Sequence, residues 1–180
     1  MVRAKSGDHD AFSMLAAAAI RHLLAMARLI LRDDDRAQDA VQDALVDAWL
    51  DIRGLRDPDR FDAWLHRLLV RRCYRAAERD RGRRLVEVPL LPIDAPSTPD
   101  TQAALAAREQ LDAAFSRLPT DQRAVLVLHH FLNKTDGEAA EILDIPIGTF
   151  KSRLNRATQT LRAAVEADDR RAALREEPMV

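Results

Sequence analysis

Apolar residues recur at helical spacing in two parts of the chain, one on each side of a proline-rich stretch. Steps of three and four between apolar positions predict an amphipathic helix where they persist for several turns. Before the proline-rich stretch, this pattern predicts helices at about 8–31, 35–52 and 59–81. After it, the pattern predicts helices at about 105–118, 120–132, 135–143 and 146–162. No alternating strand pattern of useful length occurs, so we predict an all-α protein.

The proline-rich stretch is the segment 86–100, VEVPLLPIDAPSTPD, which holds four prolines and has no helical period. Such segments stay extended and contribute little to a core, so we interpret this one as a linker. It divides the chain into two small helical domains, 1–85 and 101–165. The remaining residues, 166–180, are interpreted as a charged tail that frays.

Local signals predict where the C-terminal helices begin. Thr135 and Glu138 in the sequence TDGE match the capping box, in which the threonine accepts from the backbone and the glutamate reaches back. Thr120 or Asp121 is expected to cap the preceding helix. Pro146 suits the first position of the last helix, where its missing N–H costs nothing. A short helix, the tight turn DIPIGT and a second helix then form a helix-turn-helix.

The last helix has two distinct faces. One is an apolar stripe that we expect to be buried: Ile147, Phe150, Leu154, Ala157 and Leu161. The opposite face carries polar and basic groups and no acid: Ser152, Asn155, Arg156 and Gln159, flanked by Lys151 and Arg153. Such groups read the DNA major groove, arginine or lysine at guanine and asparagine or glutamine at adenine. A solvated amphipathic helix has the same pattern, but the capped helix and turn before it favour DNA binding.

Charge is segregated along the chain, although the formal net charge is only −1. Eight arginines lie in 67–84 against two acids, whereas aspartates dominate 33–51. Binding to DNA depends on local patches within a Debye length, which is about 10 Å at moderate salt. The near-neutral composition therefore does not exclude a nucleic-acid partner.

Composition and motifs argue against several other classes of protein. Charged residues make up 32% of the chain, and uninterrupted apolar runs fall far short of the roughly 20 residues of a membrane span. The polar N-terminus lacks a signal peptide, and the single Cys73 excludes an intramolecular disulfide, so we expect a cytoplasmic protein. The adjacent His129 and His130 point about 100° apart and cannot share a metal without a third ligand. With no glycine-rich phosphate loop or nucleophile elbow, we expect no catalytic site, metal or cofactor.

Two sets of motifs resemble one family. LPTDQRAVLVLHHF and EAAEILDIPIGTFKSRLNRATQTLR resemble region 4 of the extracytoplasmic-function, or group IV, sigma-70 factors. DHDAFSML, RAQDAVQDALVDAW and RDPDRFDAWLHRLLVRRCYRAAER resemble region 2 of the same family, in its order and at its spacing. The two matches flank the expected linker and cover nearly the whole chain. The resemblance implies a promoter-specificity subunit that binds core RNA polymerase and directs transcription initiation.

The resemblance also implies which residues contact the −35 element of a promoter. Region 4 of the family reads this element through the second helix of its helix-turn-helix. On the matching positions, Lys151, Ser152, Asn155 and Arg156 would face bases, and Arg153 would lie on phosphate.

For the −10 element, the resemblance points to the arginine-rich third helix and the loop before it. Arg67, Arg71, Arg72 and Arg75 would follow phosphates, each adding a salt-dependent increment of affinity. The family captures an unstacked base in the loop 53–60, which here holds the candidates Arg56, Asp57 and Arg60. Trp64 invites a stacking role, but its spacing favours the core, and Tyr74 lies nearer the basic face.

A third implied site would contact the polymerase. DAVQD matches the family's contact motif, and Asp39, Gln42 and Asp43 form one helical patch that could meet the coiled coil of the largest subunit. In isolation the motif favours a solvated acidic face, but its position two turns before Trp49, inside the region 2 match, favours the polymerase contact. The family is often held inactive by an anti-sigma protein, which makes such a partner an expectation here. The alternative function is a stand-alone two-domain helix-turn-helix regulator, with 1–85 as a sensor or dimerisation domain.

Overall fold

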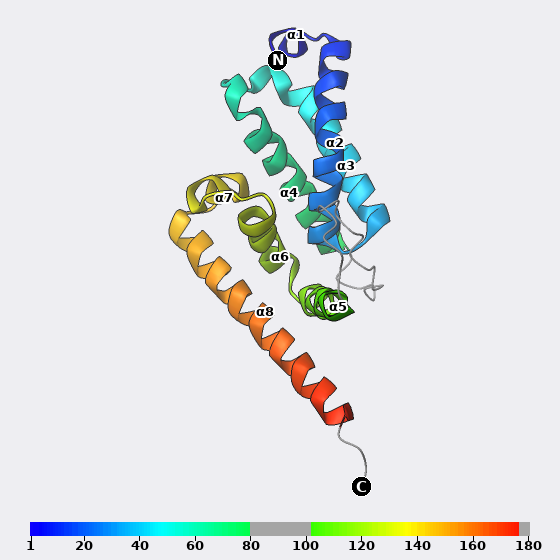
Figure 1. Ribbon diagram of the computed structural model, residues 1–180. Coiled ribbons are helices and arrows are strands. Elements are labelled where there is room, and N and C mark those ends of the chain that lie inside the picture. Colours follow the sequence, from blue (N-terminus) through cyan, green and yellow to red (C-terminus); the bar gives the residue numbers. More distant parts are fainter. Residues whose placement is uncertain (80–101, 177–180) are drawn as a thin grey trace.

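The computed structural model describes residues 1–79 and 102–176, and every regular element in these ranges is a helix (Figure 1). The prediction of an all-α protein is therefore confirmed. The linker predicted at 86–100 lies outside the described residues.

The N-terminal unit is a bundle of three long helices preceded by one short helix. Helix α1 spans Val2–Lys5, α2 spans His9–Leu31, α3 spans Asp34–Asp51 and α4 spans Phe61–Arg79. Two 3₁₀ turns, Ile52–Gly54 and Pro58–Arg60, connect α3 to α4. Helix α3 packs against both α2 and α4, which buries the apolar stripes that the sequence predicts.

Side chains define the ends of these helices. Asp8 accepts from the backbone N–H of Ala11 at 2.9 Å and begins α2, and Asp33 accepts from the N–H of Arg36 to begin α3. Arg32, between α2 and α3, adopts a left-handed conformation with φ of 58°. This single residue ends α2 and turns the chain back, so that α3 lies against it.

The C-terminal unit contains four further helices. Helix α5 spans Gln102–Ser116, α6 spans Thr120–Leu126, α7 spans Asp136–Leu143 and α8 spans Ile147–Glu176, and a π-helical segment, Val127–Phe131, follows α6. Helix α8 packs against α5, α6 and α7 and extends away from the N-terminal unit (Figure 1). The predicted capping box at the start of α7 is confirmed, with both of its hydrogen bonds formed by Thr135 and Glu138.

Three expectations for the C-terminal unit were wrong in detail. No side chain caps α6, because Pro119 precedes it and the Thr120 hydroxyl accepts from Arg123 instead. Pro146 precedes the first helical residue of α8 rather than occupying it, and Ile147, expected in the core, is half exposed. The last helix also continues past residue 165.

The continuation of α8 is held by polar contacts with α5 and with the residue that follows it. Arg117 donates to the Asp168 carboxylate at 2.8 Å, and the Gln110 amide donates to Asp169 at 2.6 Å. The segment interpreted as a charged tail therefore begins as an ordered, paired part of the helix. The sequence pattern hides this because the segment lacks an apolar stripe of its own.

The two units share one continuous core. Helix α4 packs against α6 and α7, and α2 packs against α6. At the centre of this contact the Arg123 guanidinium is buried, and its Nε donates to the carbonyl of Ile30 at 2.6 Å. Its Nη1 donates to the carbonyls of both Leu118 and Ser116. A second arginine, Arg32, forms a bidentate pair with Asp112 of α5.

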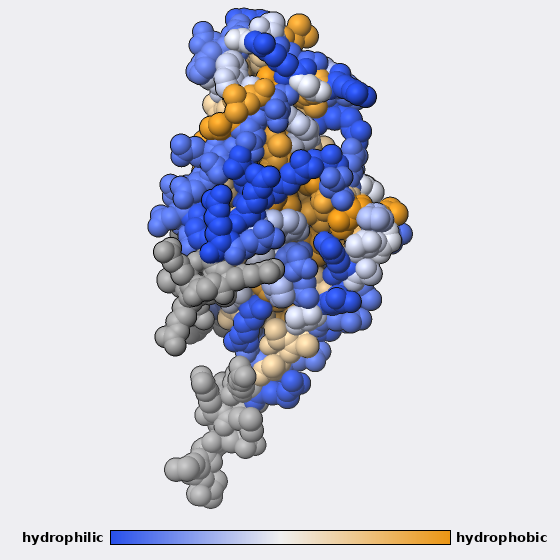
Figure 2. Space-filling model, turned by 180° about the vertical axis from the view of Figure 1, so that it is seen from behind, coloured by the Kyte–Doolittle hydropathy of each residue, from blue (hydrophilic) through white to orange (hydrophobic). Residues whose placement is uncertain are grey.

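By length and composition alone, α2 is apolar enough to cross a membrane, which the count of uninterrupted apolar runs did not reveal. In the structure this helix buries Leu23, Met26 and Ile30 in the shared core and contacts α3, α4 and α6. Core helices of water-soluble proteins meet the same criterion. The surface seen in Figure 2 is mostly hydrophilic, with smaller hydrophobic areas.

Candidate nucleic-acid and polymerase interfaces

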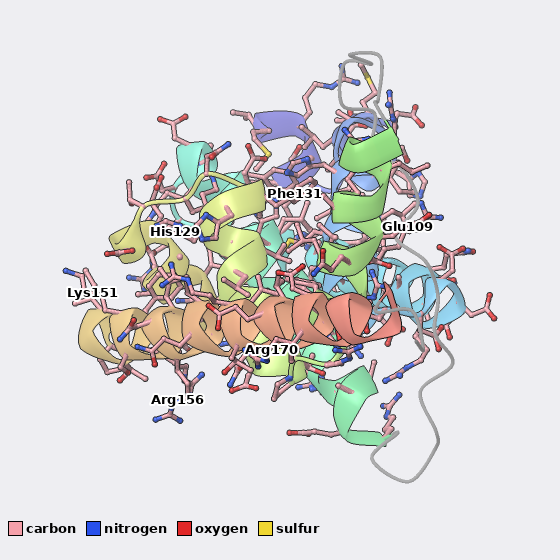
Figure 3. All side chains as sticks on the ribbon, turned by 60° about the horizontal axis from the view of Figure 1, so that its bottom comes forward. Glu109, His129, Phe131, Lys151, Arg156 and Arg170 are labelled. Atoms are coloured by element: carbon pink, nitrogen blue, oxygen red, sulfur yellow. The ribbon has the colours of Figure 1, made fainter. Side chains whose placement is uncertain are left out.

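The outer face of α8 is open to solvent. Lys151, Ser152, Asn155 and Arg156 are all exposed, whereas Phe150 and Ala157 on the opposite side are fully buried. Arg156 points away from the body of the protein, and Lys151 lies near the first turn of the helix (Figure 3). The Lys151 ammonium lies 3.9 Å from the Asp136 carboxylate, a loose contact that DNA phosphates could replace. The helix thus presents the predicted −35 candidates together on one surface.

Arg153 has a different environment from its neighbours. It is half-buried and near Tyr74 of α4, whose hydroxyl is buried without a hydrogen-bond partner among the described residues. Burial raises the pKa of Tyr74 to about 12, so the phenol is neutral at pH 7. The sequence placed Tyr74 near a DNA-facing surface, and the structure places it at the contact between the two units.

The arginines predicted to follow −10 phosphates lie on α4, but most of them are engaged by acids. Arg67 donates to the carbonyl of Glu141 at 2.6 Å and also contacts the Asp144 carboxylate at 3.4 Å. Arg71 donates to Asp144 at 3.1 Å. Arg60, in the loop before α4, pairs with the Glu141 carboxylate. These acids belong to α7 and to the residue that ends it, so the two predicted DNA-binding units meet at this surface.

Arg72 is held within its own unit. Its guanidinium pairs with the carboxylates of Asp47 and Asp43, both on α3, and the contact to Asp43 is 3.0 Å long. The hydrogen bond from Arg72 lowers the pKa of Asp47, and the same bond raises the pKa of Arg72. This bridge fixes α3 against α4. Arg75, the next candidate, is exposed and lines a groove of about 220 Å³ beside α3.

The loop predicted to capture an unstacked base borders a cleft of about 220 Å³. Its lining includes the side chains of Arg56, Asp57 and Trp64, so the half-buried Trp64 is neither wholly core nor wholly surface. One wall of this cleft is α7, through Glu141 and Ile142. The cleft offers charged and aromatic groups of the kind that hold a base.

The candidate polymerase patch lies on the outer side of α3. Asp39, Gln42 and Asp43 are all exposed and occupy one face of the helix, as their spacing predicts. Asp43 also belongs to the bridge with Arg72, so the patch and the arginine-rich helix are in contact. Asp39 and Gln42 are the members that the structure leaves facing solvent.

Groups that could perform covalent chemistry are poorly placed for it. Cys73 is fully buried, and desolvation raises the pKa of its thiol to about 12. The His129 and His130 rings meet edge to face at 4.6 Å between centroids, and His129 lies 3.7 Å from the Asp136 carboxylate. Within residues 1–79 and 102–176, no group of three metal-binding side chains is assembled.

Sequence reasoning missed several residues that shape these surfaces: Asp47, Arg123, Glu141 and Asp144. Asp47 had a signal, because it follows Asp43 by one turn on a helix that faces the arginine-rich segment. Glu141 and Asp144 carry no local signal, since their role depends on how two distant units pack.

Comparison with known proteins gives the same two regions. The family model of sigma-70 region 2 matches residues 15–84, and that of sigma-70 region 4 matches residues 108–161. The ECF RNA polymerase sigma factor SigM of Mycobacterium tuberculosis is 33% identical over 157 residues, covering 87% of this chain and 78% of that protein. The RNA polymerase sigma-E factor of Streptomyces avermitilis is 36% identical over 147 residues, covering 82% and 80%.

Two solved structures have a similar fold. One is CnrH in complex with the cytosolic domain of CnrY, with a TM-score of 0.66 and 29% identity, covering 93% of this chain and 95% of that one. The other is the sigma factor RpoE in complex with the anti-sigma factor NepR from Bartonella quintana. Its TM-score is 0.67 at 26% identity, and the match covers 87% of this chain and 98% of that one.

Proposed function

Because the chain belongs to the extracytoplasmic-function sigma factors of the sigma-70 family, we propose that it binds core RNA polymerase through α3 and promoter DNA through α4 and α8. The observation that carries this assignment is the combination of two exposed surfaces on one chain. One is the acidic and amide patch of Asp39 and Gln42, and the other is the basic outer face of α8. A regulator that binds duplex DNA alone has no use for the first.

On α8, the proposed base-reading residues are Lys151, Ser152, Asn155 and Arg156, which are exposed together on one face. Arg153 sits half-buried at its edge, a position suited to a phosphate. Guanidinium and amide side chains at this spacing can form bidentate contacts to guanine and adenine. We therefore assign the −35 element to this helix.

On the N-terminal unit, we assign the −10 element to Arg67, Arg71 and Arg75 of α4 and to the loop that holds Arg56 and Asp57. Loss of stacking for one base costs a few kcal/mol, which contacts inside the adjacent cleft would offset. Arg72 has a supporting role in this proposal, because its guanidinium already bridges to α3.

We also propose that the protein acts in the cytoplasm, because its proposed partners, core RNA polymerase and promoter DNA, are there. We further propose that an anti-sigma protein regulates it. The support is structural: the fold matches two structures, over most of each chain, that were solved with a partner protein.

The decisive experiment is assembly with core polymerase. The double variant Asp39→Ala, Gln42→Ala should lose co-elution with core enzyme in gel filtration while its helical circular dichroism stays that of the wild type. Glu166→Ala, which removes one exposed carboxylate from α8, serves as the control and should assemble normally. Normal assembly of the double variant would refute the α3 assignment. A shift of duplex DNA by the free protein, with no binding to polymerase, would establish the stand-alone regulator.

A further inference from the structure

Helix α1 lies at the end of the N-terminal bundle where the chain passes from α3 to α4, and it contacts the first of the two 3₁₀ turns there (Figure 1). These turns border the loop 53–60, which holds the proposed −10 residues Arg56 and Asp57. One hydrogen bond joins α1 to this loop: the Lys5 ammonium donates to the carbonyl of Leu55 at 2.6 Å, across 50 positions of chain. A bond from a charged donor is shorter and stronger than one between neutral groups.

Leu55 is the residue through which the loop is attached to the rest of the unit. Its side chain is buried, and it belongs to the lining of the cleft of about 220 Å³ at the proposed base site. Its backbone N–H donates to the carbonyl of Ile52 at 3.2 Å, which closes the first 3₁₀ turn. Its carbonyl accepts from Lys5. Arg56 and Asp57 follow directly, so the position of Leu55 determines where their side chains line the cleft.

A second close approach between the two segments lies just after α1. Gly7 has a φ of 94°, and a Cβ atom added there would lie 3.0 Å from Nη2 of Arg53 in the first 3₁₀ turn. Glycine avoids both the strain of this backbone conformation and the contact with the guanidinium. The N-terminal segment and the start of the loop are therefore in close contact at two points, Lys5 with Leu55 and Gly7 with Arg53.

Other contacts than that of Lys5 anchor α1 itself. A helix of four residues is not stable alone, so packing must hold it in place. Ala4 is fully buried in the core, and the Arg3 guanidinium pairs with Asp8, the residue that caps α2. The backbone N–H of Asp8 also donates to the carbonyl of Arg3 at 3.0 Å. With α1 fixed in this way, the bond from Lys5 acts on the loop.

A pocket that takes one unpaired base needs a fixed shape. Removing a base from the stack costs free energy, and contacts that are already in place offset this cost most efficiently. The residues 55–57 lie between the two 3₁₀ turns and have no regular structure of their own. At their far end, the Asp57 carboxylate accepts from the N–H of Asp59 at 3.0 Å and begins the second turn. The bond from Lys5 fixes their near end, so this short segment is held at both ends.

We propose that Lys5 is a positioning residue for base recognition: its bond to the Leu55 carbonyl fixes the loop that takes an unpaired base of the −10 element. The inference rests on the proposed −10 role of this loop and adds to it a residue from the opposite end of the unit's sequence. Lys5 acts through the backbone of Leu55 and not through DNA. Its loss should therefore weaken the preference for one base at one position, rather than the affinity for every sequence.

The test uses holoenzyme assembled with the variant Lys5→Met, which keeps the apolar stem of the side chain and removes the donor. The probe is a promoter fragment that wild-type holoenzyme selects from genomic DNA, with the non-template bases of its −10 element left unpaired and varied one at a time. At one position, the ratio of affinities for the best base and the others should fall about threefold to tenfold, because a loosely held loop samples unproductive geometries. The ratios at the other positions should not change.

Two further variants serve as controls. Lys5→Arg restores a charged donor and should recover the preference. Arg3→Met removes the same charge from the same helix, at a side chain that is 78% exposed, and should leave the preference as in the wild type. All three variants should bind core polymerase equally well, since α1 contacts the turn that follows α3, away from Asp39 and Gln42.

Asp57→Ala in the same assay separates this inference from the proposed function beneath it. If Lys5→Met keeps the preference at every position while Asp57→Ala loses it at one, the positioning role is refuted and the −10 assignment stands. If Lys5→Met weakens binding to all bases equally and lowers the salt dependence, Lys5 is a phosphate contact and the proposal is wrong. If Asp57→Ala and Arg56→Ala also keep every preference, the loop does not read the −10 element, and the positioning role fails with that assignment.

Discussion

The outer face of α8 and the arginine-rich face of α4 carry the same kind of side chain in different surroundings. On α8, Arg156 and Asn155 face solvent, and Lys151 has a loose contact to the Asp136 carboxylate. On α4, Arg67 and Arg71 both contact Asp144, the residue that ends α7, and Arg72 pairs with acids of the neighbouring helix α3. A count of positive residues would rank α4 as the stronger DNA-binding surface. In the folded chain, α8 is the one that is ready to bind.

This difference follows from where each helix lies in the shared core. Helix α8 forms one outer side of the molecule, so a single face is buried (Figure 1). Helix α4 lies between α3 and α7 and is covered from two sides. Four substitutions test the comparison, beginning with the residue that holds the two units together.

Arg123→Met should have the largest effect. The buried guanidinium satisfies the carbonyls of Ile30 and Leu118, and each acceptor left buried and unsatisfied costs about 1–3 kcal/mol. We expect the free energy of unfolding in urea to fall by roughly 3 kcal/mol or more. Arg117→Met, which removes only a surface pair with Asp168, should cost well under about 1 kcal/mol. Equal losses would mean that Arg123 is not an anchor between the units.

Arg156→Ala tests the open face. If Arg156 makes a bidentate base contact, its loss should cost about 1–3 kcal/mol of holoenzyme binding and relax preference at one −35 position. Arg153→Ala, its partner at the edge of the face, should weaken all promoters alike and lower the salt slope by roughly one unit. A randomised −35 library at two salt concentrations distinguishes the two. Unchanged selection in both variants would remove α8 as the reader.

His66 tests the contact between the units through pH. Burial, with a smaller effect of His22, lowers the pKa of His66 from 6.5 to about 4. Between these values the unfolded chain binds more protons than the folded chain, so stability should fall as the pH drops below about 6.5. At pH 5.5 the loss should be on the order of 1 kcal/mol relative to pH 7.5. His66→Asn should abolish this pH-dependent loss of stability. His9→Asn, at an exposed site, should leave the loss unchanged.

Asp47→Asn should have the smallest effect, because the bridge to Arg72 is partly exposed. We expect a loss of less than about 1 kcal/mol in the free energy of unfolding at pH 7. The hydrogen bond from Arg72 lowers the pKa of Asp47, so this stabilisation is present above pH 3.8 and is lost as the pH falls through the lowered pKa. The free energies of unfolding of variant and wild type, measured by urea titration, should therefore become equal at acid pH. A constant difference would assign the effect to packing instead.

Much of the fold was predictable because its signals are local. The capping box at Thr135 and the buried stripe at Phe150 and Ala157 follow from the sequence around each residue. The end of α8 was not predictable in the same way, since Asp168 is held by Arg117, the residue that follows α5. Contacts between residues far apart in the sequence do not produce a recognisable period in the sequence around either residue.

The residues of the candidate site show the same difference between local signals and long-range contacts. The exposed residues of α8 could be chosen from helical geometry, and so could Asp39 and Gln42 on α3. The engagement of Arg67 by α7 could not, because it joins residues 74 positions apart. The sequence identified the basic side chains on the surface of α4. The structure added that some of these arginines already contact groups at the end of α7.

Cys73, buried on α4, gives the protein a practical property. A thiol whose pKa is raised to about 12 holds almost no thiolate near pH 8, and thiolate is the species that maleimides, iodoacetamide and peroxide attack. Reagents should modify the native protein slowly and the unfolded protein quickly, so the rate of alkylation would report global unfolding. Cysteines introduced on α2 and α8 could then carry fluorescent dyes without removal of the natural one, and the distance between the two units could be followed in real time.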